Sequence, residues 1–197
     1  MLAHTIALAQ TAGVFDTIYV STEDLEIARI ATEYGAEVID RPIQLAQDHI
    51  TVDDVVTHAL EARPEIDVLC CIYATAILLR PETIVAAQAL LESGQGCDHV
   101  MGVSEYEHPP VQALIADAGG FLGYMWPEWR GVQSQQQPKL VVSDGTFYWT
   151  KAEAFRREKT FYGKRLKGFT VPNDQVSDVD TKEDLEKLVR VLEQRDK

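Results

Sequence analysis

The sequence predicts one α/β domain with a mainly parallel sheet and helices on both faces. Short apolar runs alternate with amphipathic segments along most of the 197 residues, and parallel strands need helical crossovers that cover both faces of their sheet. Composition agrees, because a chain that is 46% hydrophobic and 25% charged has enough apolar material for one sizeable core. No Pro/Gly/Ser-rich linker divides it, so we expect residues 1–197 to form a single domain.

Hydrophobic periodicity and helix-end signals give the elements in chain order. The expected helices span residues 2–11, 23–34, 52–62, 82–92 and 181–194, with Pro81 at the first position of the fourth. The expected strands span residues 16–21, 37–40, 66–74 and 98–103. A turn at Asp144-Gly145 is expected to lead into an aromatic strand ending at Trp149.

The segment 106–138 has a different pattern. Two β-like runs flank Gly119-Gly120, which is a hairpin signal, and an aromatic, Gln-rich stretch follows as far as Pro138. Its aromatic side chains exceed what a two-stranded hairpin can bury on itself. We therefore expect this small β excursion to leave the main sheet and to pack as a flap on a second copy of the chain.

Ligands of parallel α/β sheets bind at the carboxyl ends of the strands, where the sequence places several polar side chains. Ser21 or Thr22 is expected to cap the following helix. Arg41 offers a planar fork of donors for a nucleobase edge or a phosphate, although it also fits an exposed arginine paired with a nearby acid. The strand through Cys71 ends in small residues, Ala74-Thr75-Ala76, which permit close approach by a ligand.

Two aspartates stand one residue apart just before the last helix. In an extended backbone Asp178 and Asp180 point to the same side, so both carboxylates can bind one divalent cation such as Mg²⁺ while Val179 faces the core. In the alternative interpretation, Asp180 is only the N-cap of the helix and Glu183 completes a capping box. The sequence pattern alone leaves both interpretations open.

Charge and composition limit the partners and the compartment. A net charge of −13 argues against nucleic acid or an anionic membrane surface as a partner. No apolar run is long enough to span a bilayer and no secretory signal is present, so we expect a cytoplasmic protein. The three cysteines and five histidines lack metal-ligand spacing and are interpreted as packing or surface residues.

Five motifs in order resemble those of the acylneuraminate cytidylyltransferases, and the similarity is strongest to the pseudaminic acid branch of that family. The resemblance covers essentially the whole chain. The motifs are Tyr19–Asp24, Arg41–Asp48, Cys71–Ala76, Asp144–Trp149 and Asp178–Asp184. The branch-specific matches are Ile72–Ala76, Pro110–Leu114, Trp126–Glu128 and Phe147–Trp149.

The resemblance implies a Rossmann-like three-layer αβα nucleotide-diphospho-sugar transferase fold and a homodimer. It also implies reaction of CTP with a nine-carbon 2-keto sugar acid to give the CMP-sugar and pyrophosphate, with Mg²⁺ held by the catalytic residues Asp178 and Asp180. The implied nucleotide-binding residues are Arg41, Ala46, Asp48, Tyr73 and Thr75. The implied sugar-side residues are Gln112 and Asp144.

Three departures from the family pattern are visible. The first strand of the family and its Gly/Arg/Lys-rich loop have no counterpart before Met1, Ile77 replaces a proline, and Gln133 replaces a basic residue. We expect neighbouring strands with unpaired backbone groups beside a solvent-filled or collapsed slot. We also expect Met1 to be internal to a longer reading frame, or the front of the gene to have been lost.

These departures lead to the expectation that the chain as given is inactive, because an acidic chain without its triphosphate-binding cations binds CTP poorly. One alternative is a non-catalytic homologue that acts as a dimerisation or regulatory partner of an intact enzyme. Another is activity on a different sugar acid, such as Kdo or neuraminic acid.

Overall fold

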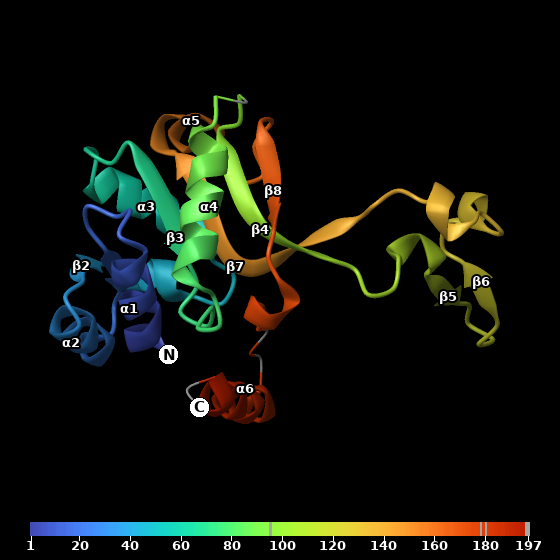
Figure 1. Cartoon of the computed structure of the whole chain (residues 1–197), viewed down its shortest axis with the longest axis horizontal. Helices are drawn as coiled ribbons and strands as arrows, with labels where there is room; N and C mark the ends of the chain where they lie inside the picture. The colour runs from blue at the N-terminus through green and yellow to red at the C-terminus, as the bar shows by residue number, and fades with distance from the viewer. Residues whose placement is uncertain (95, 178, 180, 196–197) are drawn as a thin grey trace.

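A computed structural model of the chain describes residues 1–94, 96–177, 179 and 181–195 (Figure 1). Its helices are α1 (Leu2–Ala12), α2 (Leu25–Glu33), α3 (Val52–Ala62), α4 (Pro81–Glu92), α5 (Ala152–Glu158) and α6 (Lys182–Arg195). Its strands are β1 (Tyr19–Thr22), β2 (Glu37–Asp40), β3 (Val68–Ile72), β4 (His99–Glu105), β5 (Leu114–Ala116), β6 (Leu122–Tyr124), β7 (Val141–Lys151) and β8 (Leu166–Thr170).

The largest sheet has the strand order β3-β7-β4-β8. Strand β7 runs antiparallel to both β3 and β4, and β4 is parallel to β8, so β3, β4 and β8 share one direction. Strands β1 and β2 form a separate parallel pair. The predominance of one strand direction agrees with the prediction, but the antiparallel β7 and the division into separate sheets were not expected.

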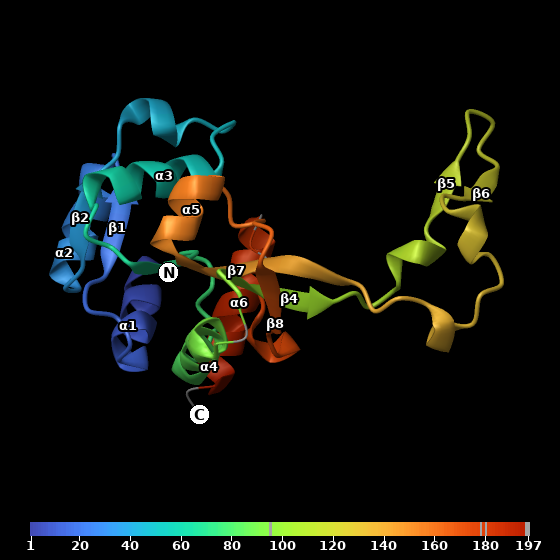
Figure 2. The ribbon, with the colours of Figure 1, turned by 90° about the horizontal axis from the view of Figure 1, so that it is seen from above.

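Helices cover both faces of the larger sheet, which gives three layers (Figure 2). On one face, Leu8 of α1 and Ile84 of α4 pack in a cluster that includes Trp149 of β7. On the other face, Leu60 of α3 and Phe155 of α5 pack in a second cluster. The two faces are therefore covered by α1 and α4 on one side and by α3 and α5 on the other, as apolar residues of the sheet require.

Local chemistry fixes the helix starts, and here one prediction was wrong. The N-cap of α2 is Asp24, whose carboxylate accepts hydrogen bonds from the backbone of Glu26 and Ile27, at 2.8 and 2.9 Å. Thr22 instead accepts from the backbone of Asp24, at 3.1 Å. Strand β1 ends at Thr22, one residue later than expected. Asp24 therefore takes the capping role that Ser21 or Thr22 was expected to fill.

The Asp144-Gly145 segment lies inside β7 and does not form the turn that the sequence suggested. The pairing of β4 with β7 shifts register between Met101 and Val103, and Gly145 has a positive φ of 67° within the irregular stretch. Such a bulge lets a long strand bend without ending. The sequence indicated a glycine with a positive φ at position 145, which the structure shows. It also indicated a reversal of the chain there, whereas β7 continues through Gly145.

The excursion leaves the main body as an arm that carries the hairpin of β5 and β6 (Figure 1). Its apolar side chains are exposed: Phe121 is 77% exposed, Leu122 67% and Ile115 57%. This apolar surface lies well away from the clusters that form the core.

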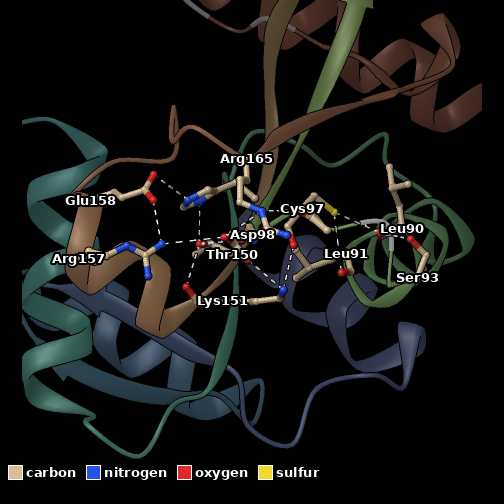
Figure 3. Close-up of polar contacts among 12 residues, drawn as sticks. Leu90, Leu91, Ser93, Cys97, Asp98, Thr150, Lys151, Arg157, Glu158 and Arg165 are labelled. Atoms are coloured by element: carbon tan, nitrogen blue, oxygen red, sulfur yellow. Dashed lines mark hydrogen bonds and ion pairs between the residues drawn. The ribbon is translucent and has the colours of Figure 1, made fainter.

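At the amino end of β4, a polar cluster joins the sheet to α5 and to the start of β8 (Figure 3). The carboxylate of Asp98 lies 3.0 Å from Nζ of Lys151 and 3.5 Å from Nε of Arg165. The hydrogen bond from Lys151 lowers the pKa of Asp98 below its ordinary value. The neighbouring His99 is fully buried, with Nδ1 at 2.8 Å from Oγ1 of Thr150, and burial lowers its pKa.

Among the described helices, none combines the length and the apolar character needed to cross a membrane.

Candidate active site

The carboxyl end of β3 provides a small-residue turn beside the start of two other segments. The chain turns after Tyr73, whose carbonyl accepts from the backbone of Ala76 at 2.9 Å. Thr5 at the start of α1 donates its hydroxyl to the carbonyl of Ala74 at 3.1 Å, and Ser177 donates to the carbonyl of Thr75 at 3.0 Å. The turn therefore joins the start of α1 to the segment that leads to α6.

Arg41 follows β2, and its guanidinium is held by one carboxylate. Its Nε and Nη2 donate to Oε2 of Glu23 at 2.9 and 2.5 Å. The hydrogen bond from Arg41 lowers the pKa of Glu23 below its ordinary value. The sequence analysis left open a pairing of Arg41 with a nearby acid, and the structure shows this pairing. It also leaves Arg41 in the cavity described next, with its orientation fixed by Glu23.

A cavity of about 1090 Å³ brings four of the predicted nucleotide residues together. Arg41, Ala46, Tyr73 and Thr75 all line it, and they come from two separate segments of the chain, 41–46 and 73–75. Ala46 ends the 3-10 helix η1 (Ile43–Ala46). Asp48, two residues further on, is exposed and is not among the residues that line the cavity. The chain thus assembles these residues at the carboxyl end of β3, where α/β sheets bind ligands.

The charge of the cavity wall is unusual for a site that receives a triphosphate. Arg41 is the single basic residue among the described residues that line it, and its charge is offset by Glu23. Several acids also line the cavity: Asp16, Glu65, Asp67 and Glu92. A bound polyphosphate therefore needs further positive charge, from a cation or from other residues.

The two predicted sugar-side residues are placed differently from each other. The carboxylate of Asp144 accepts from the backbone of Thr146 at 3.0 Å and from its hydroxyl at 2.5 Å. Gly145, next to it, lies against the ring of Tyr73, so Asp144 is adjacent in sequence to a residue that contacts the cavity wall. Gln112 lies on the arm, where its amide donates to Gln137 at 3.3 Å. Gln112 and Asp144 are not brought together by any contact within the described part of the chain.

Close packing supports the position of Asp144. A Cβ added to Gly102 of β4 would lie 2.7 Å from Oδ1 of Asp144 and 2.4 Å from Oγ1 of Thr146. Only glycine at position 102 leaves room for the carboxylate, so β4 and the bulge of β7 fix it together. The sequence analysis did not identify Gly102, because a glycine within a strand has no signal beyond its small size.

The predicted metal ligands Asp178 and Asp180 lie outside the described residues. Their described neighbours show where the segment goes: Ser177 bonds to Thr75, and Val179 packs against the cluster of Ile77, Leu78 and Leu188. Val179 thus faces the core as predicted. Within the residues that the structure describes, no group of three or more His, Cys, Asp or Glu side chains has the arrangement of a metal site.

The helix that follows is capped by Thr181, one residue later than the alternative interpretation required. The hydroxyl of Thr181 accepts from the backbone of Asp184 at 3.2 Å, and the carboxylate of Asp184 accepts from the backbone of Thr181 at 3.1 Å. This reciprocal pair is a capping box. Asp180, on which the alternative box with Glu183 depends, lies outside the described residues, and the capping box that the structure shows is made by Thr181 and Asp184.

The three-layer fold and the cavity at the strand ends define an α/β protein whose ligand site lies at the carboxyl ends of its strands. A family model described as Cytidylyltransferase matches residues 1–196. The chain belongs to this cytidylyltransferase family and is a CTP-dependent nucleotidyltransferase by that membership.

Curated relatives agree with the family assignment. The chain is 29% identical over 192 residues to the pseudaminic acid cytidylyltransferase of Campylobacter jejuni, which covers 94% of this chain and 82% of that protein. It is 27% identical over 187 residues to the N-acylneuraminate cytidylyltransferase of Streptococcus agalactiae, covering 93% of this chain and 45% of that protein.

Solved structures share the fold. CMP:2-keto-3-deoxy-manno-octonic acid synthetase complexed with CTP superposes with a TM-score of 0.70 at 13% identity, covering 98% of this chain and 88% of that one. The 4-diphosphocytidyl-2C-methyl-D-erythritol synthase of Anaerococcus prevotii gives a TM-score of 0.67 at 12% identity, with the same shares covered. The predicted nucleotide-diphospho-sugar transferase fold is confirmed by these neighbours.

Proposed function

We propose that this protein transfers CMP from CTP to a nonulosonic acid of the pseudaminic or sialic type and releases pyrophosphate. The observation that carries the proposal is the similarity to the Campylobacter jejuni pseudaminic acid cytidylyltransferase along 94% of the chain. The cavity at the end of β3 adds support, because it gathers Arg41, Tyr73 and Thr75 where such a fold binds its nucleotide. CTP is a cytoplasmic metabolite, so the proposed reaction belongs in the cytoplasm.

In the proposed reaction, the anomeric oxygen of the sugar acid forms a bond to the α-phosphorus of CTP. The bond between the α-phosphorus and the bridging oxygen breaks, pyrophosphate leaves, and the hydroxyl proton passes to a nearby base or to water. The protein contributes mainly position and charge to such a transfer. Arg41, Ala46, Tyr73 and Thr75 would hold the nucleotide, and Asp48 would lie near its cytidine side. Asp144 and Gln112 would face the sugar.

Mg²⁺ fits this proposal through the chemistry of its ligands. Asp178 and Asp180 supply carboxylate oxygens, which Mg²⁺ prefers, and Thr181 and Asp184 take the capping role that would otherwise compete for Asp180. Bound there, the ion would neutralise phosphate charge that Arg41 alone does not match. Either aspartate would also suit as the base for the attacking hydroxyl.

We further propose that the arm packs on a second copy of the chain, so that a symmetric homodimer forms. The support is the set of exposed apolar side chains on the hairpin, which extends away from the main body (Figure 1). In such a dimer the arm, residues 106–138, would cover the sugar side of the partner's site, which gives Gln112 a role away from its own cavity.

A substrate screen tests the activity. The protein is incubated with Mg²⁺, each of CTP, UTP, ATP and GTP, and each of pseudaminic acid, N-acetylneuraminic acid and Kdo, and pyrophosphate release is measured. Release with CTP and pseudaminic or N-acetylneuraminic acid, together with a CMP-sugar mass, would support the proposal and would contradict the inactivity expected from the three sequence departures. Turnover with Kdo alone would change the substrate class. No turnover and no CTP binding by calorimetry would instead support a non-catalytic homologue.

A further inference from the structure

The ion pair of Glu23 and Arg41 joins the carboxyl ends of two neighbouring parallel strands. Strands β1 and β2 pair in register, with Thr22 opposite Asp40. The next residues along the two strands are Glu23 and Arg41, which therefore lie side by side (Figure 2). The backbone N–H of Arg41 donates to the carbonyl of Thr22 at 3.1 Å, which extends the strand pairing to this point. The motif Tyr19–Asp24 thus places a carboxylate against Arg41.

The backbone of each partner is held by its own segment. Asp24 caps α2, and its N–H donates to Oγ1 of Thr22 at 3.1 Å, so the turn that carries Glu23 is fixed on both sides. Arg41 precedes Pro42, and a residue before proline is restricted to extended backbone angles. Both side chains of the ion pair therefore start from a fixed backbone.

The contact between the two side chains restrains the guanidinium of Arg41. Its Nε and Nη2 both donate to Oε2 of Glu23, at 2.9 and 2.5 Å, and the side chains of Arg41 and Glu23 are 23% and 28% exposed. A long, unrestrained arginine side chain has many rotamers, and ordering it during ligand binding weakens the affinity. Glu23 has already ordered this side chain before a ligand enters the cavity.

The same contact leaves Arg41 able to bind a ligand. A guanidinium carries five N–H groups, and the bonds to Glu23 use two of them. Arg41 lines the cavity of the candidate active site, whereas Glu23 is not among the described residues that line it. Glu23 therefore acts on a ligand in the cavity through Arg41 and not by direct contact.

The charge of Glu23 and its position have opposite effects on an anionic ligand. As a negative charge beside a site for a triphosphate, Glu23 opposes binding, so its removal would strengthen binding. As a restraint on Arg41, Glu23 favours binding, so its removal would weaken binding. The chain has a net charge of −13 and several acids already line the cavity. A further carboxylate has no electrostatic benefit there, and the benefit that the geometry offers is positional.

We propose that Glu23 is a positioning residue for nucleotide binding, which holds the guanidinium of Arg41 in the one orientation that donates hydrogen bonds to the nucleotide. This gives a role to the end of the motif Tyr19–Asp24, which the proposed reaction does not otherwise use. The proposal rests on the function proposed above, because it takes the nucleotide to be CTP.

A double-mutant cycle on the full chain tests this proposal. Calorimetric titration with CTP and Mg²⁺ compares the unchanged protein with Glu23→Ala, Arg41→Ala and the variant that carries both substitutions. We expect Glu23→Ala to weaken CTP binding about three- to tenfold, the effect of ordering one long side chain during binding. In the Arg41→Ala background the same substitution should not weaken CTP binding further, since no guanidinium remains to be positioned.

Two further variants separate position from charge. Glu23→Gln removes the charge but keeps an oxygen that can accept from Arg41, so its CTP affinity should lie between those of the unchanged protein and Glu23→Ala. Glu26→Ala is the matched control, because it removes an exposed carboxylate from the first turn of α2 and should not weaken CTP binding. The melting temperature of each variant measures the effect on fold stability separately.

NMR of the Arg41 side chain gives a reading that does not require CTP. In the unchanged protein the Nε–H signal of Arg41 should exchange slowly with water, because this group is bonded to Glu23. In Glu23→Ala the same signal should exchange rapidly, and its loss in Arg41→Ala identifies it. Equally rapid exchange in the unchanged protein and in Glu23→Ala would show that Glu23 does not restrain Arg41, and would overturn the proposal.

The binding data can overturn the proposal in two further ways. CTP affinity that is unchanged or higher in Glu23→Ala would limit Glu23 to its charge or to fold stability. Equal weakening by Glu23→Ala with and without Arg41 would mean that Glu23 acts by another route. Both results would leave the proposed function intact, whereas a lack of CTP binding by the unchanged protein would refute the proposed function and this proposal together.

Discussion

At the start of α6, the residues that cap the helix differ from the residues proposed to bind a metal ion. Thr181 and Asp184 form the capping box, so the two preceding aspartates are not needed to begin the helix. Sequence analysis proposed both aspartates as metal ligands and left a cap at Asp180 open as the alternative, whereas the described residues show a cap at Thr181. The sequence alone does not decide between them, because Asp and Thr are both favoured N-caps and both stand at the boundary. Substitutions at Asp178 and Asp180 therefore test the proposed metal role, and a substitution at Thr181 tests the helix cap.

We predict that Asp178→Asn and Asp180→Asn each abolish Mg²⁺-dependent formation of CMP-sugar and leave the free energy of unfolding nearly unchanged. Thr181→Ala is the matched control: it removes a cap and should cost about 1 kcal/mol of stability while activity persists. Turnover assays and urea unfolding of the three variants give the comparison. Full activity in the Asp178→Asn/Asp180→Asn double variant would contradict the metal role. Because Asn caps helices as well as Asp does, a loss of about 1 kcal/mol in Asp180→Ala is the result that would return Asp180 to the helix cap.

Arg41 allows a second test at this scale, because its fork is fixed by Glu23. Arg41→Ala should weaken CTP binding by about tenfold or more, the effect of losing a charge-assisted hydrogen bond. Arg41→Lys keeps the charge but not the planar fork, so it should recover only part of the loss. Calorimetric titration with CTP and Mg²⁺ measures both. Equal affinity in Arg41→Ala and the unchanged protein would mean that Arg41 only pairs with Glu23.

At the scale of elements, periodic segments were predicted well and irregular ones were not. Strand β2, helix α3 and helix α4 have the expected bounds, because each has a clear apolar period and an end signal. The sequence analysis did not identify α5 or β8, which are short and follow directly on β7 or a loop. The antiparallel direction of β7 was also missed, since strand direction depends on the path of the arm and has no local signal.

The cluster between β4 and α5 predicts how stability changes with pH (Figure 3). Burial lowers the pKa of His99 in the folded state below its ordinary 6.5, so the unfolded chain binds the proton more tightly. The stability contributed by neutral His99 is complete above pH 6.5 and is lost as pH falls through the lowered value. Asp98 acts in the same sense at lower pH, because its pKa is lowered from 3.8.

We therefore expect the melting temperature to decrease as pH falls below 6.5, with a further decrease below about pH 4. His99→Gln removes the group responsible for the decrease just below pH 6.5. The melting temperature of this variant should therefore vary less between pH 6.5 and 5 than that of the unchanged protein. Asp98→Asn should lower stability at pH 7 by about 1–3 kcal/mol, because it leaves Lys151 and Arg165 without their carboxylate. Melting curves at several pH values measure all three. An unchanged pH dependence in His99→Gln would show that another group titrates.

For the whole molecule, the sequence analysis identified more of the fold than of the site. Alternating elements and the family resemblance were enough for the three-layer fold, and Arg41, Ala46, Tyr73 and Thr75 do meet in one cavity. The sequence analysis did not predict contacts between segments that are distant in the chain. These are the hydrogen bond of Arg41 to Glu23, that of Ser177 to Thr75, and the close approach of Gly102 to Asp144. Strands β1 and β3 belong to separate sheets, and residues of both line the cavity.

The arm gives the prediction for assembly. A hairpin that exposes Phe121 and Leu122 at its tip cannot bury them on its own two strands, so a second copy is the simplest cover. Light scattering at micromolar concentration should give a dimer mass for the unchanged protein. The double variant Phe121→Asp/Leu122→Asp should be a monomer. Its melting temperature should be preserved, apart from losing its dependence on protein concentration, because the arm lies outside the core clusters.

Leu25→Asp, which changes an 87% exposed residue on α2, is the matched control and should remain dimeric. A monomer mass for the unchanged protein would refute the arm as a dimer interface, and a dimer that survives both aspartates would place the interface elsewhere on the body.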